Sequence, residues 1–157
     1  MSISLEVTSS ALAADAPMPA RFTADGENVS PPLSWGTPPP ETKSFAIVVD
    51  DPDALAKPNF HHWSAWNIPA DQRELHAGIT TSEDAADLRQ GRNDFDATGY
   101  GGPKPPRGET HRYVFRVLAL DVVPDLPTGS TRHALEQAIE GHVLAEGRLV
   151  VPYRRTP

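Results

Sequence analysis

A loop rich in glycine and proline, residues 99–108, leads directly into the strand pattern of residues 111–115. Glycines let backbone N–H groups approach a ligand, and prolines hold a loop in one shape. Alternation along the strand puts His111 and Tyr113 on the same face. Imidazole, phenol and amide groups can all donate hydrogen bonds to a phosphate. The spacing therefore predicts an anion pocket.

Acidic residues follow the apolar run 45–49, in the order Asp50-Asp51-Pro52-Asp53. Folds commonly build sites at such a strand end. An Asp-Pro dipeptide also commonly begins a solvent-exposed turn, so the alternative is a solvated turn. The residues alone leave both interpretations open.

The run His61-His62-Trp63 lies in a second strand pattern. Alternation makes a histidine and a tryptophan that are adjacent in a strand face opposite ways. One histidine then shares a face with Ser64 and Trp66, and the other shares a face with Trp63 and Ala65. One interpretation is a histidine that contributes to a site. The other is a core histidine bonded to a backbone carbonyl.

Other chemistries lack support in the sequence. Asp51, His62 and His111 would form a set of two histidines and one carboxylate, but they lie on separate segments without metal-ligand spacing, so we expect no metal site. The chain has no cysteine for thiol catalysis. It also lacks a Gly-x-Ser-x-Gly elbow and the glycine motifs of nucleotide sites, so we expect no cofactor.

The composition limits the kind of protein that could contain such a pocket. The 157 residues suit one domain, 1–157, and 38% of them are hydrophobic. A net charge of -7 disfavours a nucleic-acid surface or an anionic membrane as partner. No stretch approaches the roughly 20 apolar residues of a membrane span. Residues 1–7 lack the features of a secretory signal, so we expect a cytoplasmic protein.

The chain is predicted to be mainly β, because 17 prolines and 11 glycines divide it into short segments. We expect a helix over residues 132–140, with Thr131 as N-cap and Gly141 as its stop. Residues 82–90 are either a second short helix or an acidic, solvated loop. No internal repeat or linker divides the chain. Strands are expected at residues 3–7, 45–49, 62–68, 111–120 and 148–151.

Several ordered motifs resemble those of one family. They are Asp25-Gly26-Glu27-Asn28-Val29-Ser30-Pro31-Pro32-Leu33-Ser34-Trp35, Asp51-Pro52-Asp53-Ala54, His62-Trp63 with Asn67-Ile68-Pro69, the glycine and proline loop, His111-Arg112-Tyr113 and Ala119-Leu120-Asp121. With these motifs the chain resembles the phosphatidylethanolamine-binding proteins, and among them the bacterial Raf kinase inhibitor-like group of the YbhB/YbcL type. The match runs nearly end to end.

The resemblance implies a β-sandwich with a central antiparallel Greek-key sheet, a second smaller sheet and a few short helices. It also implies a homodimer and a small cavity for phosphate or phosphorylated head groups. Carried over to this sequence, the ligand-binding residues would be Asp51, His62, Gly101, Gly102, Pro106, His111 and Tyr113.

Individual residues of that cavity have expected roles. A lone carboxylate repels phosphate, so Asp51 would orient a histidine, raise its proton affinity or meet an ammonium group. Arg112 faces away by alternation, and we expect it to form a structural ion pair with an acid such as Asp94 or Asp96. Lys104 adds a cation near the mouth of the cavity.

The leading hypothesis is a non-enzymatic binding module for a phosphorylated small molecule or a phosphorylated residue of a partner, with a link to kinase signalling through that partner. One alternative is inhibition of a protease or kinase through the rim of the pocket. Another is a weak hydrolase in which His62 or His111 acts as general base and Asp51 orients it.

Overall fold

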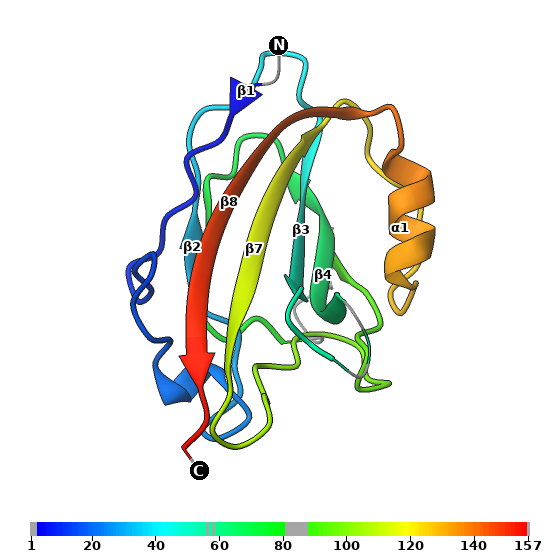
Figure 1. Cartoon of the computed structure of the whole chain (residues 1–157). Coiled ribbons are helices and arrows are strands. Elements are labelled where there is room, and N and C mark those ends of the chain that lie inside the picture. Colours follow the sequence, from blue (N-terminus) through cyan, green and yellow to red (C-terminus); the bar gives the residue numbers. More distant parts are fainter. Residues whose placement is uncertain (1–2, 56, 58, 81–87, 157) are drawn as a thin grey trace.

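The computed structural model describes residues 3–55, 57, 59–80 and 88–156. Its main sheet has the strand order β1-β8-β7-β3-β4-β6, in which β1 pairs parallel to β8 and the other neighbours pair antiparallel. A smaller sheet joins β2 to β5. Along the chain the elements are β1 (Ile3–Ser4), the 3-10 helix η1 (Ala20–Phe22), β2 (Leu33–Ser34), β3 (Ser44–Asp51), β4 (Phe60–Pro69), β5 (Glu74–Leu75), β6 (Arg89–Gln90), β7 (Thr110–Leu120), α1 (Arg132–Ile139) and β8 (Val143–Arg154) (Figure 1).

The main sheet contains a Greek key. Strands β3, β4 and β6 follow one another in space, and β7 then returns to the other side of β3. This 4-1-2-3 order is the Greek-key arrangement, with β5 set aside in the smaller sheet. The mainly β class, the central antiparallel sheet and the second smaller sheet are thereby confirmed.

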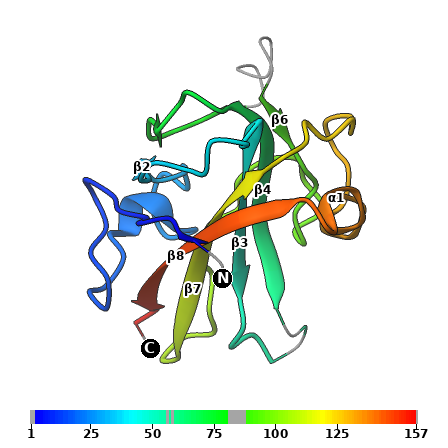
Figure 2. The same ribbon diagram turned by 90° about the horizontal axis from the view of Figure 1, so that it is seen from above.

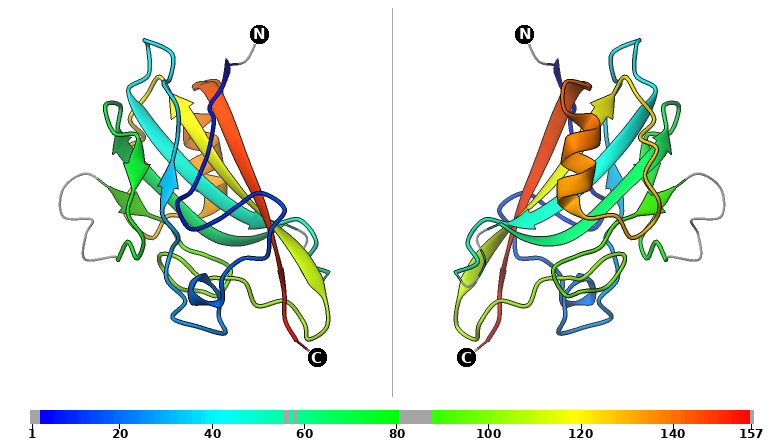
Figure 3. Two further views of the ribbon diagram at one scale, coloured as in Figure 1. Left: turned by 90° about the vertical axis from the view of Figure 1, so that its left-hand side faces the viewer. Right: turned by 90° about the vertical axis from the view of Figure 1, so that its right-hand side faces the viewer.

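Both faces of the main sheet are covered. On one face Phe45 and Phe115 belong to a core that includes Leu33 of β2 and Leu75 of β5. On the other face Val48 and its neighbours pack against Leu135 and Ile139 of α1. Figure 2 places β2 and α1 on opposite sides of the sheet. The two side views of Figure 3 show the first segment of the chain in front of one face and α1 in front of the other.

The helix expected near the C-terminus is confirmed. The Thr131 hydroxyl accepts a hydrogen bond from the Ala134 N–H at 3.1 Å, and Gly141 adopts a φ of +82° just beyond the helix. Left-handed backbone favours glycine, so this position ends the helix. The expected segment 82–90 lies largely outside the described residues, and its last two, Arg89–Gln90, form β6.

Two expected strands have different lengths in the structure. β8 is longer than residues 148–151, because it pairs with β7 along its whole length, from Val143 to Arg154. β1 is shorter than residues 3–7. The chain leaves β8 after Leu5, and Thr8 forms a bridge to Ser34 of the smaller sheet. Pairing with residues that are distant in the sequence therefore sets the lengths of both strands.

Candidate anion-binding site

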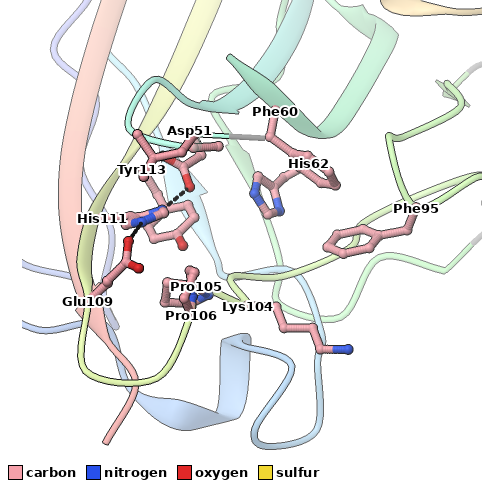
Figure 4. Close-up of a pocket in the computed structure, with 12 residues that line it drawn as sticks. Asp51, Phe60, His62, Phe95, Lys104, Pro105, Pro106, Glu109, His111 and Tyr113 are labelled. Carbon is pink, nitrogen blue, oxygen red and sulfur yellow. Dashed lines mark hydrogen bonds and ion pairs between the residues drawn. The ribbon is translucent and has the colours of Figure 1, made fainter. Parts of the chain in front are cut away.

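The candidate site lies at the end of the main sheet where β3 ends and where β4 and β7 begin. A cavity of about 340 Å³ opens there. Figure 4 shows side chains from these strand ends and from the loop after Phe95 converging on it. The lining residues are Asp51, Ala54, Leu55, Phe60, His62, Phe95, Lys104, Pro105, Pro106, Glu109, His111 and Tyr113.

A β-bulge in β4 aims His62 at this cavity. The register pairs Val49 with Trp63 and Asp50 with His61, which leaves His62 as the extra residue. Such a bulge interrupts the alternation of side chains between faces. The His62 ring therefore lies on the cavity side and contacts the Tyr113 ring, with 5.3 Å between ring centroids.

The expectation that the adjacent His62 and Trp63 face opposite ways is therefore wrong. Trp66 packs in the core under α1, on the other face of the sheet. His61 points to that face as well, where its Nδ1 lies 2.8 Å from Asp50 Oδ1. A single inserted residue has exchanged the faces of the two neighbouring histidines.

His111 is held between two carboxylates. Its Nδ1 lies 2.7 Å from Asp51 Oδ2, and its Nε2 lies 3.1 Å from Glu109 Oε1. Ionised carboxylates only accept hydrogen bonds, so both ring nitrogens donate when the ring is protonated. Burial by itself would lower the pKa of His111, but the bonds to Asp51 and Glu109 raise it above 6.5. The two carboxylate contacts therefore favour the imidazolium form of His111 at the floor of the site.

His62, in contrast to His111, has its pKa lowered. Its Nδ1 lies 2.6 Å from the Gly101 carbonyl oxygen, which only accepts, so Nδ1 carries the hydrogen. Burial lowers the pKa of His62 below 6.5 in spite of this bond. Phe60 and Phe95 lie against the ring, with centroids 5.0 and 5.5 Å away. The neutral ring leaves Nε2 as a hydrogen-bond acceptor.

Tyr113 contributes a hydroxyl with no partner. The residue is 1% exposed, and its oxygen makes no hydrogen bond within the described part of the chain. Burial, the charge of Asp51 and an interaction between the hydroxyl and the Asp51 side chain raise the pKa of Tyr113 above its usual value. The hydroxyl therefore stays protonated at neutral pH and remains available as a donor. Figure 4 shows it beside the His111 ring and pointing toward the cavity.

The glycine loop supports the site from behind. The Gly101 N–H donates to the His62 carbonyl oxygen at 2.9 Å, and the Gly102 N–H donates to Asn28 Oδ1 at 2.8 Å. Neither glycine is among the residues that line the cavity. The structure thus brings Asp51, His62, Pro106, His111 and Tyr113 together, and it places Gly101 and Gly102 in the second layer. Their amides are already bonded within the protein, contrary to our expectation of free donors.

Arg112 forms the expected structural ion pair, but with Asp53 rather than with Asp94 or Asp96. Its guanidinium binds Asp53, with Nη2 2.9 Å from Oδ1 and Nε 3.0 Å from Oδ2. Asp94 instead accepts from Lys57, and Asp96 pairs with Arg92. The turn after β3 brings Asp53 beside the start of β7, and this proximity decides the pairing.

The acidic run at the end of β3 divides between the two faces of the sheet. Asp51 faces the cavity with Oδ2, and its Oδ1 accepts the Asp53 N–H at 2.8 Å, which stabilises the turn. Asp50 faces the other side, where it binds His61 and lies 2.9 Å from the Arg132 guanidinium. Asp50 and Asp51 therefore lie on opposite faces of the main sheet.

Three of the lining residues that the sequence analysis missed contact the histidines of the site. Glu109 lies two residues before His111, and the alternation that grouped His111 with Tyr113 could have included it. Phe60 lies two residues before His62, so strand alternation could have indicated it in the same way. Phe95 comes from a loop, and no local pattern indicates its place at the mouth.

The described residues contain no cluster of three or more histidine or acidic side chains suited to a metal ion. Within the same residues, no helix has the length and apolar character needed to cross a membrane.

Comparison with known proteins identifies the family. The family model for phosphatidylethanolamine-binding proteins matches residues 8–154. The chain belongs to the phosphatidylethanolamine-binding protein family. The fold agrees with that of a solved family member, Escherichia coli YbcL, at a TM-score of 0.89 and 30% sequence identity, over 97% of this chain and 99% of YbcL.

Relatives by sequence belong to the bacterial and archaeal branch of the family. A UPF0098 protein of Methanothermobacter thermautotrophicus is 48% identical over 139 residues, which cover 88% of this chain and 91% of the relative. The UPF0098 protein YbhB of Escherichia coli is 39% identical over 132 residues, covering 82% of this chain and 84% of YbhB. Their shared name, UPF0098, specifies no activity.

Proposed function

We propose that this family member is a non-enzymatic binding protein whose cavity takes phosphate or a phosphorylated head group. The observation that carries the proposal is the unpartnered Tyr113 hydroxyl beside the His111 imidazolium. A buried polar group without a partner is costly, and a ligand oxygen would supply the missing acceptor. The family description, phosphatidylethanolamine-binding protein, names a ligand that carries a phosphate.

The positively charged side chains of the cavity can bind a small anion by direct contact. His111 supplies a positive charge at the floor, and Lys104 supplies a second one at the mouth. Asp51 and Glu109 offset them, so recognition rests on directed hydrogen bonds as well as on net charge. A ligand oxygen near Tyr113 would also compete with Glu109 for the Nε2 hydrogen of His111.

The lining lacks the hydroxyl and thiol nucleophiles that hydrolases use most often. Among its described residues there is no serine, threonine or cysteine. When protonated, His111 donates from both ring nitrogens to carboxylates, and this imidazolium has no free ring-nitrogen lone pair with which to act as a general base. These observations argue against His111 as a general base, and a turnover assay tests His62 in that role.

The test is an NMR titration with inorganic phosphate and with O-phosphorylethanolamine, on wild type, Tyr113→Phe and His142→Gln. His142 is an exposed histidine paired with Asp121 away from the cavity, so its variant is the matched control. We expect saturable shifts at His62 and His111. Loss of one hydrogen bond to a charged ligand should weaken binding of Tyr113→Phe about tenfold. The control should bind like wild type.

Absence of saturable shifts at millimolar phosphate would overturn the proposal. Equal affinity of Tyr113→Phe and wild type would remove the observation on which it rests. A panel of phosphoesters and esters incubated with the protein addresses the hydrolase alternative, for which we expect no turnover.

An apolar rim favours a second candidate, contact with a protein partner that presents the phosphate. Leu55 is 84% exposed and Phe95 is 41% exposed beside the mouth. Leu55→Ser should leave phosphate affinity unchanged and weaken capture of a phosphorylated kinase or protease partner. Homodimer formation and a cytoplasmic location stay predictions, and sedimentation of the purified chain tests the former.

A further inference from the structure

A second cavity lies on the α1 face of the main sheet. It has a volume of about 400 Å³, and the start of β4, residues 92–96 and the start of α1 surround it. The lining residues are Lys57, His61, Arg92, Asn93, Asp94, Asp96, Thr131, Arg132, His133 and Glu136. None of them lines the anion cavity. The two cavities are therefore separate sites on opposite faces of one sheet.

The His61 ring reaches this second cavity with one nitrogen unpartnered. Its Nδ1 lies 2.8 Å from Asp50 Oδ1 on β3. The two nitrogens of an imidazole point in different directions, so this contact turns Nε2 away from β3, toward the cavity. Nε2 forms no hydrogen bond within the described residues, although His61 is only 2% exposed. A buried polar atom without a partner is costly, so a bound molecule would supply what the chain does not.

A hydroxyl group is the ligand group that suits Nε2 best. The Asp50 carboxylate only accepts, so the Nδ1 hydrogen is directed at it. Nε2 then accepts a hydrogen bond when the ring is neutral and donates one when the ring is protonated. A hydroxyl both donates and accepts, whereas an ammonium only donates and an ionised carboxylate only accepts. Only the hydroxyl among these groups meets Nε2 in both states.

The charges around the cavity balance one another. The ion pairs of the lining are Lys57 Nζ with Asp94 Oδ1 at 2.9 Å, Arg92 Nη2 with Asp96 Oδ1 at 3.3 Å, and Arg132 Nε with Glu136 Oε1 at 3.3 Å. Behind the floor, Asp50 adds a negative charge that the Arg132 guanidinium and the N-terminus of α1 offset. An anion would meet the acids and a cation would meet the bases. A neutral molecule avoids both repulsions.

These pairs leave hydrogen-bonding capacity for a ligand. A guanidinium has five N–H groups and an ammonium has three, more than the paired acids use. The Thr131 side chain serves the Ala134 N–H, whereas the first amides of a helix have no carbonyl partner inside it. The Arg92 and Asp96 side chains are 51% and 85% exposed, and such exposed pairs are weak enough to open. Donors beside acceptors match the hydroxyls on adjacent carbons of one molecule.

We infer that this cavity is a second binding site and that it takes a small neutral molecule with adjacent hydroxyl groups, such as a sugar or a cyclitol. One hydroxyl bonds to His61 Nε2 at the floor, and its neighbours bond to the paired acids and bases of the rim. The cavity volume lies within the range of small-molecule sites. This site goes beyond the proposed phosphate binding and does not depend on it.

The experiment is an NMR titration of ¹⁵N-labelled wild type with neutral and charged probes. The neutral probes are methyl α-glucopyranoside, methyl α-galactopyranoside and myo-inositol. The charged probes are inorganic phosphate, glycine and methylammonium. We expect at least one neutral probe to shift His61 Nε2 saturably, together with the amides of Arg92 and His133. The charged probes should leave those two amides unchanged at the same concentrations.

Two variants test the residues of the site. Arg92→Gln removes donors at the rim and should weaken binding of the neutral probe about fivefold, the effect of one hydrogen bond. Arg148→Gln is its matched control, because Arg148 is similarly exposed and pairs with Glu146 on β8, outside the cavity. His61→Phe keeps a ring but loses Nε2, and it should weaken binding about tenfold. His142→Phe is its control, and both controls should bind like wild type.

The wild-type titration stands even where His61→Phe does not fold. If no neutral probe shifts His61 Nε2 at high millimolar concentration, the inference is overturned. It is also overturned if a charged probe binds this cavity as tightly as the neutral ones, or if Arg92→Gln and its control bind equally well. Phosphate binding is recorded in the same spectra at His62 and His111, so failure of the proposed function is seen separately.

Discussion

His111 Nδ1 lies 2.7 Å from Asp51 Oδ2, although the two residues are 60 positions apart in the sequence. This contact links the start of β7 to the end of β3 at the floor of the cavity. Both residues are buried, at 5% and 3% exposure. The protonation state of the site therefore depends on a pair formed by the tertiary structure.

Replacement of Asp51 by asparagine should lower the pKa of His111, because an amide no longer stabilises the imidazolium by charge. Loss of one partner from a buried ion pair should also reduce the free energy of unfolding by about 3 kcal/mol. NMR titration of the His111 ring signals measures the first effect, and urea unfolding measures the second. Asp53→Asn is the control, and it should leave the His111 pKa nearly unchanged. An unaltered pKa in Asp51→Asn would contradict our account of the pair.

His111 should make stability decline on the alkaline side. Its pKa is higher in the folded state than the 6.5 of the unfolded chain, so the folded protein binds the extra proton between the two values. The stabilisation is complete below pH 6.5 and is lost as pH rises through the raised pKa. Urea unfolding of wild type and His111→Gln from pH 6 to 9 measures it. The difference between the two should shrink with rising pH, and a constant difference would argue against the linkage.

His62 should make stability decline on the acidic side. Its pKa is lower in the folded state than 6.5, so the unfolded chain binds more protons just below that value. The free energy of unfolding should fall as pH drops from 6.5 through the lowered pKa. His62→Phe has no such proton, so its stability should depend less on pH over this range. Equal slopes for the two proteins in urea unfolding between pH 4 and 7 would rule out this role.

Gly102→Ala should destabilise the loop behind the site. An added Cβ would lie 2.4 Å from the Phe22 carbonyl oxygen and 2.6 Å from Asn28 Oδ1, closer than real Cβ contacts. Overpacking of this kind costs about 2 kcal/mol in the free energy of unfolding. Gly36→Ala is the matched control, because its Cβ would have its nearest neighbour at 3.7 Å. Chemical unfolding of both variants checks the contrast, and equal stabilities would show that the loop has room to adjust.

Asp53→Asn should weaken the turn after β3 without affecting phosphate affinity. The Arg112 guanidinium holds the pKa of Asp53 at about 2, so the pair stabilises the fold above pH 3.8 and loses its effect as pH falls through about 2. Acid unfolding of wild type and variant should therefore converge near pH 2. Phosphate titrations should agree within twofold, since the pair faces away from the cavity. A large loss of affinity would place Arg112 in the site after all.

Local pattern predicted much of this protein. The apolar run at residues 45–49 indicated a strand buried on both faces, and the alternation at His111 and Tyr113 indicated their shared face. Side-chain direction follows the backbone period within one strand, so these features needed no knowledge of partners. The capped helix that begins after Thr131 was equally local, because its capping contact spans three residues.

The tertiary structure decided the chemistry of the site. The pairing of Val49 with Trp63 creates the bulge that turns His62 into the cavity, and a register between two strands cannot be obtained from either strand alone. The same holds for the two carboxylates around His111, one of which comes from another strand. The sequence by itself determined the segments, their faces and the donor types. Contacts between distant segments determined which ring nitrogen donates and which accepts, because protonation depends on burial and on partners that only the fold brings together.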